Sequence, residues 1–187
     1  MKHTHSTVRF FIFLGLVVSS LAQAKNAVDI ARDHHQKNAV RIVSEFRDFL
    51  AIPNVASDLG NMMDNAAFIE AYVGRRGFTS KVVTAGGAPY VIAEKAGSAS
   101  APTVLVYAHF DGQPVIPSQW SSPPFEPTLW TDNPLQADAR SLSWDQEQFD
   151  PSWRVVARSA GDDKAPVIAL MAAIDALEAA GAMPDIT

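Results

Sequence analysis

The spacing of apolar residues along the chain predicts three helices. In each helix the apolar side chains recur every three or four residues, which places them on one face. The first helix covers roughly 27–50 and stops at Pro53-Asn54, the second runs from about 61 to 74 or 77, and the third closes near Gly181. The repeat is carried by Val40, Val43, Phe46 and Leu50, then Met62, Ala66, Ile69 and Val73, then Val167, Leu170, Met171, Ile174 and Leu177.

Four other stretches have the pattern of β-strands. The β-prone run 79–84 and the apolar run 90–93 flank the turn signal Gly86-Gly87, so we expect a hairpin. Residues 103–108 form a continuous β-branched and apolar run, which is typical of a strand buried on both faces. Residues 154–157 are expected to form a short strand. Strands that alternate with covering helices predict the α/β class, with a three-layer α/β domain.

The segment from Phe110 to about Pro151 has no sustained period and is rich in proline and tryptophan. Long irregular stretches are uncommon in compact domains and are usually functional or mobile. We therefore expect this segment to be irregular.

The first 24 residues have the pattern of a signal peptide. Lys2, His3 and Arg9 precede an apolar run over 10–18, and Ala22-Gln-Ala24 has the form of a cleavage site. The alternatives are an uncleaved membrane anchor or a buried helix, but the apolar run is shorter than the roughly 20 residues that span a bilayer. We expect cleavage after Ala24 and export to the periplasm or the outside of the cell.

Composition and charge exclude several classes of protein. The chain has no cysteine, which excludes a disulfide scaffold, a thiolate zinc site, an iron–sulfur site and a cysteine nucleophile. Any metal must therefore be held by nitrogen and oxygen atoms. The formal charge of −5 gives no electrostatic basis for binding nucleic acid or an anionic membrane. A small or peptide-like partner fits better.

His109 and Asp111 directly follow the most apolar predicted strand, where α/β sheets commonly bind ligands. Residues i and i+2 of an extended segment point to the same side, so the Asp111 carboxylate can accept a hydrogen bond from one imidazole nitrogen while the other faces a metal. The alternative is a surface or hydrogen-bonded structural histidine. His34 and His35 lie on a polar part of the first helix, and we expect both to be solvated.

Asp162 and Asp163 precede the third helix and have two interpretations. Acidic residues are favoured at a helix N-terminus, where they pair with unbonded amide groups. A carboxylate can also bridge two divalent ions about 3.5–4 Å apart, as in two-metal hydrolases. The spacing alone does not choose between a helix cap and a metal ligand.

Three motifs together resemble the M20 family of zinc metallopeptidases, most of all its dipeptidase and carnosinase-like branch. They are VLVYAHFDGQPV at 104–115, WSSPPFEPT at 120–128 and ARSAGDDKAP at 157–166. The resemblance covers roughly 104–180, and 28–103 is similar in pattern only. It implies a three-layer αβα catalytic domain, of which residues 25–187 are expected to be the N-terminal part, without the remainder and the lid domain.

The resemblance also implies roles for individual residues. His109 would ligate one zinc ion, and Asp111 would be the active-site carboxylate that orients it. Asp162 would bridge both zinc ions, with a cis peptide bond to Asp163. The stretch from Trp120 to Phe125 would shape the wall of the site, with packing in the core as the alternative.

The chain departs from the family pattern in two ways. The family commonly has Gly at positions 108, 157, 159 and 165, where this chain has Ala or Ser, and it has Ser or Ala at Gly161, so the bridging loop is expected to differ in detail. The family's Glu-Glu pair, further acidic ligand and later histidine are also missing. Because two catalytic zinc ions need roughly five ligands, we expect this chain alone to bind metal poorly and to hydrolyse nothing.

For a complete parent, the resemblance implies zinc-dependent hydrolysis of amide bonds in dipeptides or N-acyl amino acids. Such a parent could form a homodimer through the lid domain. One alternative is a deacylase of the same family that acts on a non-peptide amide. Another is a non-catalytic exported binding domain that keeps the α/β half without the chemistry.

Overall fold

The computed structural model describes residues 26–187. The predicted signal peptide at 1–24 and its cleavage site lie outside these residues. In the described part of the chain, no helix combines the length and the apolar character needed to cross a bilayer.

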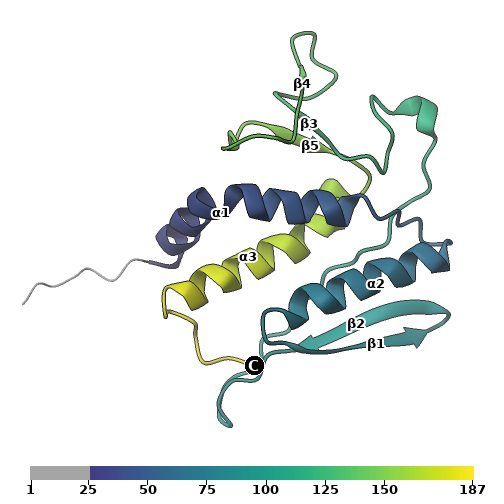
Figure 1. Ribbon diagram of the computed structural model, residues 1–187. Helices are drawn as coiled ribbons and strands as arrows, with labels where there is room; N and C mark the ends of the chain where they lie inside the picture. The colour runs from purple at the N-terminus through teal and green to yellow at the C-terminus, as the bar shows by residue number, and fades with distance from the viewer. Residues whose placement is uncertain (1–25) are drawn as a thin grey trace, which may run out of the picture.

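Three helices lie side by side at the centre of the molecule (Figure 1). They are α1 (Ala27–Leu50), α2 (Leu59–Gly74) and α3 (Ala165–Ala179), and they confirm the helices that the apolar repeat predicts. The side chain of Asn26 caps α1 by accepting a hydrogen bond from the Asp29 amide. Asp58 caps α2 in the same way through the Asn61 amide. Side-chain oxygens at these positions satisfy amide groups that the helix leaves unbonded.

The three helices share one apolar core. Within it, the ring of Phe68 stacks between Phe49 of α1 and Tyr72 of α2, with centroid distances of 4.7 and 5.6 Å. Buried side chains at helical spacing on all three helices make up the rest of the cluster: Ile42, Phe49, Ile69, Tyr72, Val73, Ile168, Met171 and Ile174. The end of α1 and the start of α3, which carry the segments described below, are therefore fixed against each other.

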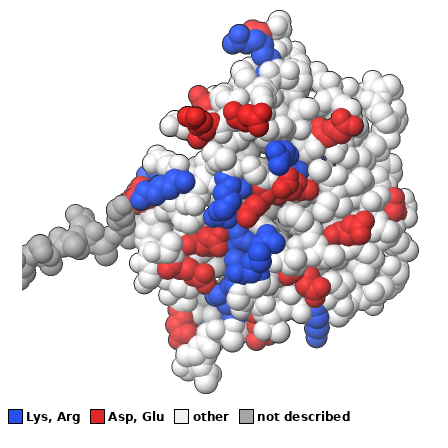
Figure 2. Space-filling model, viewed as in Figure 1, with Lys and Arg blue, Asp and Glu red and all other residues white. Residues whose placement is uncertain are grey.

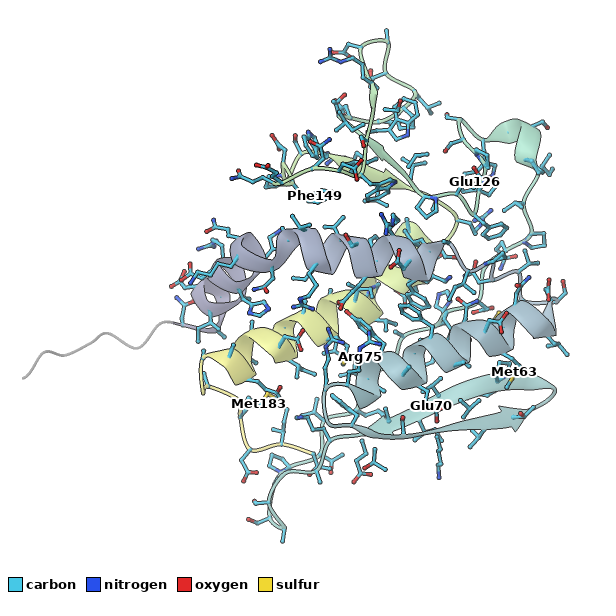
Figure 3. All side chains as sticks on the ribbon, in the orientation of Figure 1. Met63, Glu70, Arg75, Glu126, Phe149 and Met183 are labelled. Carbon is cyan, nitrogen blue, oxygen red and sulfur yellow. The ribbon has the colours of Figure 1, made fainter. Side chains whose placement is uncertain are left out.

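Two small antiparallel sheets flank the helices on opposite sides (Figure 1). Strands β1 (Thr79–Ala85) and β2 (Ala88–Glu94) form the predicted hairpin next to α2, with both turn glycines at positive φ. Strands β3 (Thr128–Trp130), β4 (Ser141–Leu142) and β5 (Arg154–Val156) pair in the order β4-β3-β5. In Figure 3, Glu126 and Phe149 lie with this second sheet, whereas Met63 and Glu70 lie with α2.

The prediction of a buried strand at 103–108 is wrong for the structure described. These residues belong to no sheet, and the side chains of Leu105 and Tyr107 are 92% and 81% exposed. A strand buried on both faces needs packed elements over each face, and the described residues leave the side chains of this segment largely uncovered. One backbone contact, from the Val104 amide to the carbonyl of Thr187 at 2.7 Å, ties the start of the segment to the end of the chain.

The α/β class is confirmed, because helices and sheets pack together in one fold. The segment 110–151 is largely irregular, as predicted, but it contains β3, β4 and the 3-10 turn η1 (Pro117–Gln119). Just before α3, the chain makes a kinked turn, η2 (Ala160–Lys164), in which Asp162 and Asp163 have non-helical backbone angles.

Candidate metal centre

The structure brings His109, Asp111 and Asp162 together. The imidazole Nδ1 of His109 lies 3.0 Å from Oδ1 of Asp111, which confirms that side chains i and i+2 of this segment face the same side. The other ring nitrogen, Nε2, lies 2.9 Å from Oδ1 of Asp162 in the turn η2. One imidazole is therefore held between two carboxylates that come from different parts of the chain.

Asp162 and Asp163 do not cap α3. The residue at the cap position is Lys164, and its side chain makes no capping hydrogen bond. The Asp162 side chain is 90% exposed, and the Asp163 carboxylate accepts a hydrogen bond from the His109 amide at 3.2 Å. The peptide bond between the two aspartates is cis, as the resemblance implies. The contacts therefore count against the helix-cap interpretation and place both carboxylates beside His109, while the metal-ligand interpretation stays a prediction.

The two carboxylates change the proton affinity of His109. Partial burial disfavours the charged imidazolium, but hydrogen bonds to Asp162 and Asp111 outweigh this effect and raise the pKa of His109 above its usual value. A metal ion that bound at Nε2 would have to displace a proton there, because metals bind the neutral imidazole.

Lys164 is a buried residue that the sequence reasoning missed. Its ammonium Nζ donates hydrogen bonds to the carbonyl oxygens of Phe49 at 2.7 Å and Ile52 at 2.8 Å, and it lies 4.4 Å from the centre of the Phe49 ring. Burial without a carboxylate partner lowers the pKa of Lys164 to about 7. This side chain ties the turn η2 to the C-terminal end of α1.

Asn54 and Ser159 were also missed as residues of the site. Both are buried, and the Asn54 amide donates a hydrogen bond to the Ser159 hydroxyl at 2.9 Å. Ser159 adopts a positive φ of 63°, at a position where the family commonly has Gly. The departure from Gly at position 159 could have indicated an unusual backbone there. In the sequence, Asn54 indicates only the end of a helix.

The loop from Trp120 to Phe125 packs against the chain that enters η2. The guanidinium of Arg158 lies 5.0 Å from the centre of the Trp120 ring, and the Arg158 amide donates to the carbonyl of Pro124 at 2.7 Å. The loop therefore lies beside the turn that carries Asp162, which is compatible with the predicted wall of a site.

The donors fit zinc in kind but fall short in number. Imidazole nitrogen and carboxylate oxygen are ordinary zinc ligands, and Asp111 on Nδ1 is the partner that a ligating histidine usually has. Catalytic zinc sites use three protein ligands for each ion. Within residues 26–187, no group of three or more His, Asp or Glu side chains could hold a metal ion.

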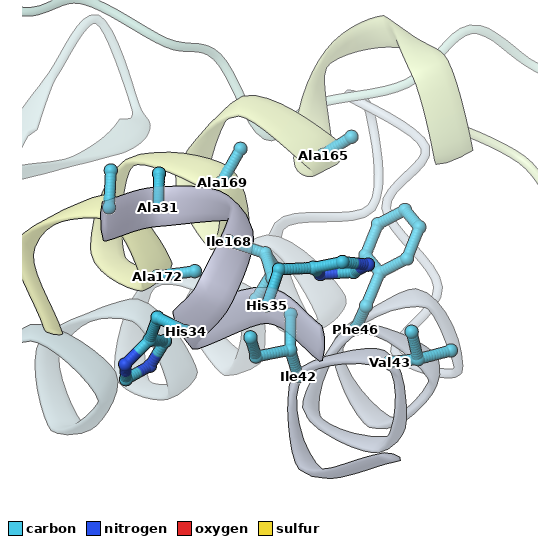
Figure 4. Close-up of a pocket in the computed structure, with 11 residues that line it drawn as sticks. Ala31, His34, His35, Ile42, Val43, Phe46, Ala165, Ile168, Ala169 and Ala172 are labelled. Atoms are coloured by element: carbon cyan, nitrogen blue, oxygen red, sulfur yellow. The ribbon is translucent and has the colours of Figure 1, made fainter. Parts of the chain in front are cut away.

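Two hollows in the surface lie elsewhere. One, of about 330 Å³, lies between α1 and α3 and includes His34, His35 and Phe46 (Figure 4). The other, of about 540 Å³, lies beside the hairpin near Lys81 and Lys95. Neither includes His109 or Asp162. His35 is exposed, as predicted. His34 is half-buried, and its covered Nε2 has no hydrogen-bond partner within residues 26–187, so the prediction that His34 is solvated was wrong.

The charged surface in view shows no region of one sign. Acidic and basic side chains alternate across the face that carries the helices (Figure 2).

The fold is similar to that of a solved structure, the di-peptidase Dug1p from Saccharomyces cerevisiae. The two align with a TM-score of 0.62 and 20% sequence identity, over 83% of this chain and 32% of that chain. The chain therefore spans about a third of the length of this relative. No protein-family model matches the chain. No curated protein matches it either.

Proposed function

We propose that this chain forms part of the active site of an M20-type zinc metallopeptidase. The activity would be hydrolysis of amide bonds in dipeptides or N-acyl amino acids. The observation that carries the proposal is the convergence of His109, Asp111 and Asp162, in a fold similar to that of a di-peptidase. The predicted signal sequence supports export to the periplasm or the outside of the cell.

Each of the three side chains has its own task in this proposal. The Asp111 carboxylate accepts a hydrogen bond from Nδ1–H of His109, which would fix the tautomer and leave the Nε2 lone pair free for a metal ion. Asp162 has a largely exposed carboxylate whose two oxygens suit a bridge between two ions. Zinc, when bound, would polarise the scissile carbonyl and activate water. The remaining ligands and the general base would come from outside the described residues.

Metal binding to the full chain tests the proposal directly. Co²⁺ takes the same nitrogen and oxygen donors as Zn²⁺ and broadens the NMR signals of nearby nuclei. Although this chain alone is expected to bind metal weakly, excess Co²⁺ should broaden the signals of His109, Asp111 and Asp162 selectively in the wild-type chain. The broadening should be lost in His109→Ala and Asp162→Ala. Asp138→Ala serves as the control, because Asp138 is an exposed carboxylate in the loop between β3 and β4. Equal broadening in all variants would refute the metal site.

Substrate preference needs the protein purified from its native source. A panel of dipeptides, N-acyl amino acids and non-peptide amides, assayed with and without a chelator, separates the dipeptidase from the deacylase. Chelator-sensitive cleavage of dipeptides is expected.

A non-catalytic binding domain of the same fold is the second candidate function. That role would show as peptide binding by the native protein without turnover. It would also leave peptide binding unchanged in His109→Ala.

A further inference from the structure

Asn54 is fully buried between the two segments that carry the proposed metal ligands. Its Nδ2 donates two hydrogen bonds, one to the carbonyl oxygen of Phe110 at 2.7 Å and one to the hydroxyl of Ser159 at 2.9 Å. Phe110 directly follows His109, and Ser159 directly precedes the turn that carries Asp162. A single side chain therefore contacts both segments.

Backbone contacts reinforce this junction, by which we mean the meeting point of Asn54 with the segments at Phe110 and Ser159. The carbonyl of Asn54 accepts a hydrogen bond from the Gly112 amide at 2.6 Å, and the Gly112 carbonyl accepts one from the Ala56 amide at 3.0 Å. A Cβ atom at position 112 would lie 2.7 Å from the Ser159 Oγ and 2.9 Å from the Asn54 Oδ1, which is closer than real contacts allow. Glycine at this position lets the three segments meet.

The chemistry of the junction requires an amide. A side-chain NH₂ group supplies two donors from one atom, which matches the two acceptors present, whereas the isosteric aspartate has no donor. The Asn54 Oδ1 is buried with no hydrogen-bond partner among the described residues, so the side chain acts here through its nitrogen. Its bond to Ser159 also helps to hold a φ of 63°, which serine rarely adopts.

We propose that Asn54 is a positioning residue, which sets the distance between His109 and Asp162 by holding their two segments together. The inference rests on the proposed function, because that function makes these two side chains metal ligands. Asn54 itself reaches no ligand atom and acts through the backbone at 110 and the hydroxyl at 159.

Asn65 provides a matched control. It is also fully buried, and its Nδ2 also donates two hydrogen bonds to backbone carbonyls, those of Pro53 at 2.8 Å and Asn61 at 2.7 Å. It has no hydrogen bond to either ligand-bearing segment. Asn65→Ala therefore removes a buried amide with two donated hydrogen bonds, as Asn54→Ala does, but from a residue bonded to neither of these segments.

The first measurement needs no metal. The His109 amide donates to the Asp163 carboxylate, so its hydrogen-exchange rate reports whether the two segments stay together. In the full chain we expect Asn54→Ala to speed this exchange about tenfold relative to Asn65→Ala, once the two variants are compared at equal global stability. Equal exchange rates in the two variants would overturn the proposal.

The second measurement uses Co²⁺ as the probe. The initial slope of signal broadening at His109 gives the relative affinity without saturation. Loss of a residue that orients ligands typically weakens metal binding about 10-fold to 100-fold. We expect a tenfold weakening in Asn54→Ala and none in Asn65→Ala, and unchanged affinity in Asn54→Ala would overturn the proposal.

Ser159→Gly is a second variant for both measurements, for use if Asn54→Ala does not fold. It removes one of the two acceptors of Asn54 and relieves the positive φ, so the chain is expected to fold and to show a smaller change in both measurements. No change in either would overturn the proposal. Failure of the metal site itself would appear separately, as broadening that persists in His109→Ala, while the exchange of the His109 amide would still decide the role of Asn54.

Discussion

The Nε2 atom of His109 lies 2.9 Å from Oδ1 of Asp162, although the two residues are 53 positions apart in the sequence. Both side chains are accessible, with 36% of the imidazole and 90% of the carboxylate exposed. The fold therefore places a nitrogen atom and an oxygen atom, both of kinds that bind metal ions, next to each other at the surface. A hydrogen bond between the imidazole and the carboxylate joins the two segments at this point.

Asp162→Asn is expected to lower the pKa of His109. The carboxylate stabilises the imidazolium through a charge-assisted hydrogen bond, and an amide at this position cannot do so equally well. Asp111→Asn should act in the same direction through Nδ1. NMR titration of the His109 ring signals measures the change. Asp138→Asn alters an exposed carboxylate in the loop between β3 and β4 and should leave the titration unaltered.

The same shift makes the stability of the chain depend on pH. Because folding raises the pKa of His109, its contribution to the free energy of unfolding is fully present below the unfolded value of about 6.5 and is lost as pH rises through the folded value. Urea unfolding across this range should show that loss in the wild-type chain but not in His109→Gln. Identical pH profiles would contradict the pairing.

Lys164 should make the free energy of unfolding rise with pH, at higher pH values than those at which His109 makes it fall. Its folded pKa of about 7 lies below the unfolded value, so between about pH 7 and 10 the unfolded chain binds more protons and the free energy of unfolding rises with pH. Lys164→Met removes this dependence and also leaves the carbonyls of Phe49 and Ile52 without their donor. The difference in unfolding free energy between wild type and variant should therefore grow with pH.

Lys81→Met is the matched control for that measurement, because Lys81 lies exposed on β1. The substitution removes the same charge from the surface. It should shift the free energy of unfolding by less than about 0.5 kcal/mol. A slope in wild type that survives in Lys164→Met would show that another group causes it.

The sequence predicts the helices and the hairpin because the information is local. A repeat of three and four residues over 27–50, or two glycines between β-prone runs, acts within a few residues of the chain. The environment of 103–108 depends instead on neighbours that local pattern does not specify, and the described residues supply none. Local periodicity gives the type of an element but not its burial.

The site also contains residues that the sequence predicts and residues that only the structure shows. His109, Asp111 and Asp162 were found because their residue types stand in motifs, although no motif shows that they touch. Asn54 and Lys164 act on partners more than 50 and more than 100 residues away, and neither residue type signals that on its own. A buried hydrogen-bond donor needs an acceptor, so a buried polar residue near a helix end indicates an acceptor that can lie far away in the sequence.

Arg76 is expected to be the main polar link between the three helices. Its guanidinium donates two hydrogen bonds to Asp175 of α3, at 2.8 and 2.9 Å, and lies 3.4 Å from Glu45 of α1. It is nearly buried and stacks 4.0 Å from the centre of the Tyr72 ring. Arg76→Met leaves two carboxylates short of a partner and should cost about 3 kcal/mol of unfolding free energy.

Arg76→Lys tests whether stability depends on the planar guanidinium group or only on its positive charge. A lysine keeps the charge but cannot bind Asp175 through two parallel bonds, so an intermediate loss is expected. Arg75→Met is the control, since the neighbouring Arg75 is exposed and lies 5.4 Å from the centre of the same ring. Equal losses for Arg75→Met and Arg76→Met in denaturant unfolding would contradict the special role of Arg76.

The exposed run 103–108 should make the described chain self-associate. Leu105 and Tyr107 are 92% and 81% exposed in an uncharged, β-prone segment, and such segments pair readily with one another. Leu105→Lys and Tyr107→Lys introduce charges that oppose this pairing, so light scattering at rising concentration should show less association than in wild type. Leu135→Lys is the matched control, because Leu135 is 83% exposed on a different loop, outside any such run. Equal reduction by Leu135→Lys would mean that general surface charge, and not the segment 103–108, governs association.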